Sequence, residues 1–156
     1  MNVTHNSKHP SVRRQNRIAA VQFLFQWELN PPLVVEDALS QFLNSQPNER
    51  SSYTFAEELI NGVIEHQDTI DSTLRRKAQN WAFDRIAKVD LAILRLAIYE
   101  LLFRPDIPPV VTINEAIELS KNFSTHDAKR FINGILDRVK ATLQRPFRQP
   151  AASITE

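Results

Sequence analysis

The chain has 156 residues and a mass of 18.0 kDa, with 42% hydrophobic and 24% charged residues, a net charge of +1 and no cysteine. This size and composition are typical of one globular domain, and they exclude a disulfide framework, thiolate chemistry and a wholly disordered chain. No apolar run approaches the roughly 18 residues that a membrane-spanning helix needs, and the amino terminus lacks the apolar core of a secretion signal. We therefore expect a cytoplasmic protein without a membrane segment.

Helices are expected to supply the core, because only two glycines occur and the alternation of β-branched residues that marks strands is nearly missing. The predicted fold class is all-α. Composition and periodicity divide the chain into a flexible arm over residues 1–10, a helical domain over residues 11–144 and a disordered tail over residues 145–156.

Helix boundaries follow from capping residues and prolines. Ser11 is expected to cap the first helix, and Pro105 to stop the most apolar one. The helix before Phe123 is expected to begin at Thr112 or Asn114. The predicted helices cover residues 11–29, 34–43, 51–78 with a bend near 66–68, 88–103, 112–123, and from Ser124 or Thr125 to beyond Val139.

The first helix carries an unusual charge pattern. Residues 1–27 have a charge of +4 and no acid, while the rest of the chain has a net charge of −3. Cations in a first helical turn oppose the helix dipole at a cost of about 0.3–1 kcal/mol each, whereas an incoming anion makes the same arrangement favourable. We therefore predict that bare guanidinium groups at this helix end bind a polyanion. The alternatives are a solubilising tail and pairing with acids such as Glu115 or Asp127. The arginines are Arg13, Arg14 and Arg17.

Candidate catalytic groups are scarce. The four histidines have no metal-ligand spacing, and two isolated glycines cannot form a phosphate-binding loop. We expect no catalytic residue, no metal and no cofactor. Glu100 lies within an apolar segment, and Arg104 at i+4 is its expected partner. The remaining aromatic residues are either core or, if exposed beside arginines, stacking platforms for unpaired bases: Trp27, Trp81, Phe83, Phe123 and Phe131.

Three long blocks of sequence are distinctive: RRQNRIAAVQFLFQWEL, FDRIAKVDLAILRLAIYELLFRPDIP and INEAIELSKNFSTHDAKRFINGILDRV. With the helices between them they cover about Val12 to Lys140, and they resemble the NusB (N-utilisation substance B) family of bacterial transcription antitermination factors. The resemblance implies two small helical bundles, here about residues 11–80 and 81–144. It implies a protein that is not an enzyme, pairs with NusE, a small-subunit ribosomal protein, and binds single-stranded boxA RNA. In that family the complex helps RNA polymerase to read through terminators, notably in ribosomal RNA operons.

The same resemblance implies the RNA-binding residues. The three arginines match the family's arginine-rich motif, although Gln15 interrupts a run that is denser in some relatives. Phe25 stands where relatives often carry an RNA-contacting tyrosine, so a stacking face is kept and a hydroxyl contact is lost. Asp127, with Phe123 and Phe131, matches a region bordering the RNA site. The full predicted set is Arg13, Arg14, Arg17, Phe25, Phe123, Asp127 and Phe131.

Two other functions and one assembly state stay open at this stage. NusB-like domains also occur as the RNA-recognition part of ribosomal RNA cytosine methyltransferases, but that function needs a following methyl-donor domain and a nucleophilic cysteine, and this chain has neither. A purely protein-binding helical module is the other alternative. Some relatives form homodimers, so a homodimer is an alternative to a monomer.

Overall fold

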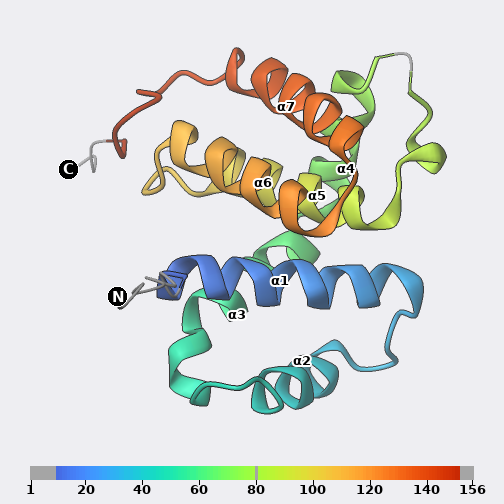
Figure 1. The fold of residues 1–156 in the computed structure, drawn as a ribbon, viewed down its shortest axis with the longest axis vertical. Coiled ribbons are helices and arrows are strands. Elements are labelled where there is room, and N and C mark those ends of the chain that lie inside the picture. The colour runs from blue at the N-terminus through green and yellow to red at the C-terminus, as the bar shows by residue number, and fades with distance from the viewer. Residues whose placement is uncertain (1–9, 80, 152–156) are drawn as a thin grey trace, which may run out of the picture.

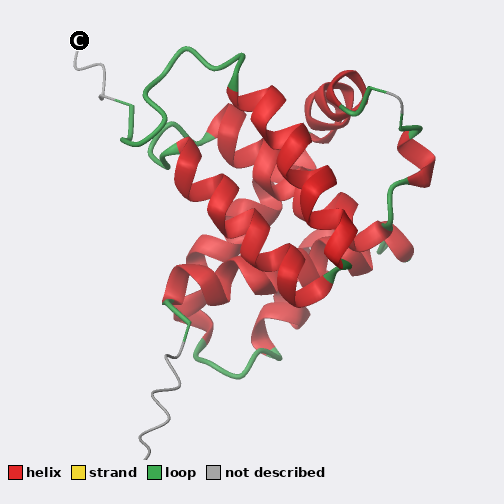
Figure 2. Cartoon of the chain, turned by 45° about the horizontal axis from the view of Figure 1, so that its top comes forward, coloured by secondary structure: helices red, strands yellow, loops and turns green. Residues whose placement is uncertain are grey.

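The computed structural model describes residues 10–79 and 81–151. The described chain is helical without a strand, which confirms the all-α prediction (Figures 1 and 2). The elements are α1 (Val12–Leu29), α2 (Val35–Asn44), the short 3-10 helix η1 (Arg50–Tyr53), α3 (Thr54–Glu65), α4 (Gln67–Lys77), the 3-10 helix η2 (Phe83–Arg85), α5 (Lys88–Phe103), α6 (Pro109–Phe123) and α7 (His126–Lys140). No helix of the described chain is both long and apolar enough to cross a bilayer.

Capping residues fix the ends of the helices that bear the candidate site. The Ser11 hydroxyl accepts a hydrogen bond from the Arg14 amide at 3.1 Å, and the Thr125 hydroxyl accepts one from the Ala128 amide at 3.3 Å. The predicted start of the helix that ends at Phe123 is wrong: α6 begins at Pro109, three residues before Thr112. Proline suits this first position because it has no N–H, and the first turn of a helix leaves its N–H groups unpaired.

Helix α5 is the centre of the molecule. Every residue from Asp90 to Leu101 is buried, and α1, α3, α4, α6 and α7 all pack against this helix. A helix that is apolar on all sides needs neighbours on all sides. In Figure 1, α1, α2 and α3 form one group and α4, α5, α6 and α7 form the other. The closest packing between the groups is that of α1 on α5.

The predicted bend near residues 66–68 is a break between α3 and α4 at His66. The His66 ring stacks on Phe103 of α5, with ring centroids 3.9 Å apart. Helix α4 packs mainly on α5 and α7 and has fewer contacts with α3. A division of the two bundles at His66 therefore describes the packing better than the predicted division at residue 80.

The carboxyl-terminal tail is not disordered over residues 145–151, contrary to the prediction. The Arg145 guanidinium donates to the backbone carbonyls of Ile107 at 2.8 Å and Leu101 at 3.0 Å. The Val110 amide donates to the Phe147 carbonyl at 2.9 Å. All three hydrogen bonds are accepted by backbone carbonyls, and such contacts leave no hydrophobic periodicity in the sequence. Residues 152–156 and residues 1–9 of the predicted flexible arm lie outside the described residues.

Candidate nucleic-acid interface

The first helix directs its arginines toward other helices. Asn16, which is buried, holds this end of α1 against α3: its side chain donates to the Ser52 carbonyl at 2.9 Å and accepts from the Ala56 amide at 2.8 Å. With α1 held in this orientation about its axis, Arg17 points toward α5, in line with the buried residues Ala20 and Leu24. The orientation of each arginine therefore follows from how α1 packs.

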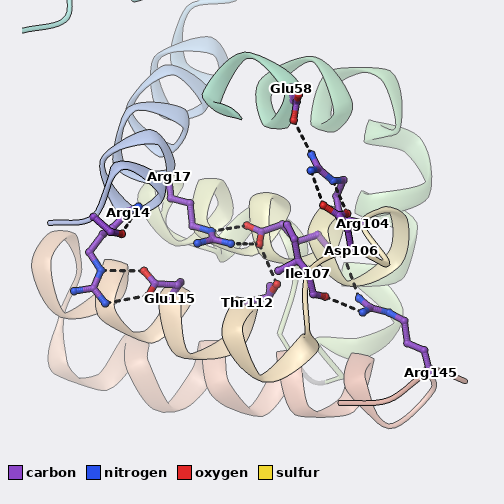
Figure 3. Close-up of polar contacts among 11 residues, drawn as sticks. Arg14, Arg17, Glu58, Arg104, Asp106, Ile107, Thr112, Glu115 and Arg145 are labelled. Carbon is purple, nitrogen blue, oxygen red and sulfur yellow. Dashed lines mark hydrogen bonds and ion pairs between the residues drawn. The ribbon is translucent and has the colours of Figure 1, made fainter. Parts of the chain in front are cut away.

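Arg17 is buried, with 3% of its surface exposed, so the prediction of a bare guanidinium group is wrong for this residue. Its Nε and Nη2 atoms donate to the two carboxylate oxygens of Glu100 at 3.1 and 2.7 Å. The Thr112 hydroxyl donates to the same carboxylate at 3.0 Å, so the three residues join α1, α5 and α6 (Figure 3). A buried charge needs such a partner, since an unpaired one would be costly.

The predicted pairing of Glu100 with Arg104 is also wrong. The Arg104 guanidinium donates to both carboxylate oxygens of Asp106 at 2.9 Å and to Glu58 at 3.2 Å. The signal that could have revealed the true partners is the position of Glu100 on α5. A carboxylate surrounded by apolar residues in a central helix must meet a cation from another element, and Arg17 continues the buried stripe of α1.

Arg14 is paired but stays partly open to solvent. Its Nε and Nη2 atoms donate to the carboxylate of Glu115 at 3.0 Å each, and 40% of its side chain is exposed (Figure 3). This contact raises the pKa of Arg14, chiefly through the hydrogen bond to Glu115. The expectation of a bare group is therefore wrong here as well, and the alternative of pairing with Glu115 is confirmed.

Arg13 is the member of the motif without a carboxylate partner among the described residues. It is exposed, and its guanidinium carbon lies 4.1 Å from the centre of the Phe55 ring. Arg17 and Arg104 also lie within 6 Å of that ring, at 5.3 and 5.5 Å. A ring face attracts a cation without neutralising it, so Arg13 keeps its charge available to an outside anion.

Phe25 lies farther along α1, half-buried against the core. Eleven residues separate it from Arg14, so it lies on nearly the same side of the helix and about 16 Å along its axis. It lines an open groove between α1 and α2, together with Gln22, Gln26 and Phe42. The ring is thus partly accessible from this groove.

The other predicted residues lie where α6 meets α7. Phe123 is 38% exposed, Asp127 is exposed, and Phe131 is half-buried against the core. The Ser124 hydroxyl donates to Asp90 at the start of α5, which fixes the turn between the two helices. Asp127 lines a shallow hollow that also contains Lys129 and Arg130, so its negative charge is set among cations.

The sequence left Trp81 open between a core residue and an exposed stacking platform, and Trp81 is not in the predicted RNA-binding set. It is 56% exposed and packs against Phe131, with ring centroids 5.2 Å apart. Trp27 and Phe83, by contrast, are half-buried against the core. The signal that favours exposure of Trp81 is its place in the irregular segment before η2, because a large ring there has no helical stripe to join.

The described residues offer no place for a metal ion. Between residues 10 and 151, with residue 80 left aside, no three histidine, aspartate or glutamate side chains come together as ligands. The candidate residues described above carry guanidinium groups, aromatic rings and the carboxylate of Asp127. Such groups recognise phosphates and bases.

Comparison with known proteins matches this chain to one family. A profile of the NusB family matches residues 14–141. The transcription antitermination protein NusB of Myxococcus xanthus (strain DK1622) is 42% identical over 137 residues, which are 86% of this chain and 98% of that protein. The protein of the same name from Bacillus subtilis (strain 168) is 41% identical over 133 residues, which are 85% of this chain and 98% of that protein.

Solved structures give the same fold. The crystal form 2 structure of T. maritima NusB superposes with a TM-score of 0.76 and 38% identity, covering 86% of this chain and 93% of that one. A crystal structure of the antitermination factors NusB and NusE in complex with dsRNA contains a chain that superposes with a TM-score of 0.74, covering 85% of this chain and 98% of that one. Its identity of 23% supports a shared fold and no more.

Proposed function

This chain is a member of the NusB family, and from that premise we propose that it is a transcription antitermination factor that binds single-stranded boxA RNA together with NusE. The observation that carries the proposal is the extent of the match: relatives called transcription antitermination proteins align over 98% of their own length at 41–42% identity. The factor works within an RNA polymerase antitermination complex in the cytoplasm, supports read-through in ribosomal RNA operons, and catalyses no reaction.

The geometry supports unequal roles for the three arginines. Arg13 and the exposed part of Arg14 contact phosphates, since planar guanidinium forks and the free N–H groups of a first helical turn both suit phosphate oxygens. Arg17 is a positioning residue, because its donors are occupied by Glu100. Its loss acts through the packing of α1 on α5 rather than through a lost RNA contact.

The aromatic rings of the predicted site offer faces for unpaired bases. Few of its arginines are free of a carboxylate partner and can neutralise phosphates. Phe25 and Phe123 each expose part of a ring, and Phe131 lies beside the exposed Trp81. Asp127 accepts a hydrogen bond from a base amino group or otherwise repels phosphate. Because few phosphates are neutralised, the chain alone binds boxA weakly, and NusE supplies the remaining contacts.

The methyltransferase alternative loses support from the same alignments. The relatives that this chain matches over nearly their whole length are called antitermination proteins. A purely protein-binding module remains the second candidate, and it differs from the proposal in one measurable property, the affinity for boxA RNA.

The test is a titration of labelled boxA RNA with the chain, with and without NusE, at fixed salt and with a scrambled RNA of equal length. We expect weak binding alone and tighter, boxA-selective binding with NusE. The variant Arg13→Ala should weaken the binding of boxA RNA both without and with NusE. The charge-matched control is Arg50→Ala, which removes a cation already paired with Glu57 at 2.6 Å. No gain from NusE, or equal binding of the scrambled RNA, would overturn the proposal.

A further inference from the structure

A groove of about 1090 Å³ runs between the carboxyl-terminal half of α1 and α2, and it is open to solvent. Aromatic rings and uncharged amide side chains line it, and none of its lining residues is charged. Small-molecule sites of about 300–1,000 Å³ enclose most of their ligand, so an open groove of this size suits a segment of a macromolecule better. We call it the α1–α2 groove. Its residues include Gln22, Phe23, Gln26, Trp27, Gln41 and Phe42.

Exposed apolar side chains continue the groove into the turn between the two helices. Leu29 and Pro32 line its end, and Leu33 and Val34 follow directly. Leu33 is fully exposed, and Leu29 and Val34 are about half exposed. Large apolar side chains gain free energy by burial, and a contiguous exposed group of them is typical of an interaction site.

The charge of this part of the chain has one sign. Residues 18–49 contain no lysine or arginine, and their acids are Glu28, Glu36, Asp37 and Glu49. Glu28 is paired with Lys88 at 3.6 Å and with Arg95 at 2.6 Å, whereas Glu36 and Asp37 form no ion pair within residues 10–79 and 81–151. The helix dipole favours acids in the first turn of α2, but it does not explain why the whole stretch lacks a basic residue.

This charge decides which kind of partner fits the groove. RNA is disfavoured, because acids without a neighbouring cation repel phosphates. A second copy of this chain would bring the same acids to the interface, and like charges facing each other are costly. In Figure 1, α2 lies at the opposite end of the molecule from α7, so the groove is also separate from the predicted RNA residues on α6 and α7. A basic partner is complementary to it.

We propose that the α1–α2 groove binds an amphipathic helix of a protein partner, with large apolar side chains in the groove and lysines or arginines on the flank that faces Asp37. A third helix can lie along two neighbouring ones with its side chains between theirs. From Gln22 to Asn30 the groove follows α1 for about 12 Å, which matches anchors at positions i, i+4 and i+7 of a bound helix. The inference does not depend on boxA RNA or on NusE.

The probe is a labelled fourteen-residue peptide with leucines at i, i+3, i+4 and i+7 spacing and lysines elsewhere, added to the full chain without RNA or NusE. One twin peptide carries glutamate in place of lysine. The other has the same composition as the probe, but its leucines do not share one helical face. Fluorescence anisotropy should show saturable binding of the probe that weakens with added salt, and little binding of either twin.

The site of binding is tested with a pair of variants on one helix. Gln41→Arg places a cation in the groove and should weaken binding of the probe by roughly 10-fold or more. The matched control is Ser40→Arg, which adds the same charge at an exposed residue of α2 that does not line the groove. Asp37→Asn should weaken binding by roughly 2- to 5-fold. Circular dichroism checks that each variant is folded.

Tryptophan fluorescence gives a second, local measurement. The chain contains two tryptophans, Trp27 in the groove and the exposed Trp81. In a Trp81→Phe chain the emission therefore comes from Trp27, and it should shift to shorter wavelength when the probe covers the groove.

Four results would overturn this inference. The probe may fail to bind at low salt, or the glutamate twin may bind equally well. Equal affinities of Gln41→Arg and Ser40→Arg for the probe, with unchanged Trp27 emission, would place binding elsewhere. Displacement of the probe by boxA RNA would assign the groove to RNA. Failure of the boxA titration with probe binding intact would instead count against the proposed function alone.

Discussion

The two arginine-rich helix ends of this molecule differ in how their charge is compensated. At the start of α1, cations oppose the helix dipole, and Arg14 and Arg17 are held by carboxylates of α6 and α5. At the end of α4, cations agree with the dipole, and Arg75 and Arg76 have no carboxylate partner in the described chain. Two of the three unfavourably placed arginines are thus neutralised by an acid from elsewhere in the fold, whereas the favourably placed ones stay open. More unpaired positive charge is therefore present at the end of α4, where cations agree with the helix dipole, than at the start of α1, where they oppose it.

The largest expected effect comes from breaking the buried pair. Arg17→Ala leaves the Glu100 carboxylate buried and unpaired, so the free energy of unfolding should fall by about 3–5 kcal/mol. Urea unfolding followed by circular dichroism measures this change. The double variant Arg17→Met, Glu100→Gln removes both charges and should be less destabilised than Arg17→Ala. If Arg17→Ala keeps wild-type stability and loses only RNA affinity, Arg17 contacts RNA and its assignment to packing is wrong.

A smaller effect is expected from opening the half-exposed pair. Glu115→Gln should free Arg14 for a phosphate, raise the affinity for boxA RNA and steepen its dependence on salt by about 0.7 in slope. The cost in unfolding free energy should be about 1 kcal/mol or less, because the Arg14 side chain is 40% exposed. The control is Glu57→Gln, which frees Arg50 from another partly exposed pair, neither member of which is in the predicted RNA-binding set. Equal gains in both variants would mean that only net charge matters.

More of the fold than of the site could be predicted from the sequence, because helix ends depend on nearby residues whereas the site depends on contacts between distant helices. Helix ends at Ser11, Thr125 and Pro105 follow from local capping and from proline, which act within a few residues. The partners of Arg17 depend on packing between α1 and α5, which are 83 positions apart along the chain at the Arg17–Glu100 contact. Ala20 and Leu24 belong to the buried stripe of α1, but how far the core extends along this helix is decided by the neighbouring helices. Exposure of Trp81 depends on the same packing, and so does the division of the bundles at His66.

The smallest expected effect is a difference in how stability depends on pH between an arginine that is paired with a carboxylate and one that is unpaired. Hydrogen bonds from Arg104 hold the pKa of Asp106 below its ordinary value of 3.8, so this pair adds stability above that pH and loses its contribution as the pH falls further. Asp106 is half-exposed, so the contribution should be below about 1 kcal/mol. The difference in urea midpoint between the wild-type chain and Asp106→Asn should therefore be constant from pH 7 to about 5 and shrink below pH 4. Arg76→Ala removes a cation that has no carboxylate partner within residues 10–79 and 81–151, so the urea midpoint should shift by an amount that does not change between pH 5 and pH 3. If the Asp106 difference instead grew on acidification, the protonated carboxyl would be the stabilising form, and the assignment of this pair as a charge-compensated one would fail.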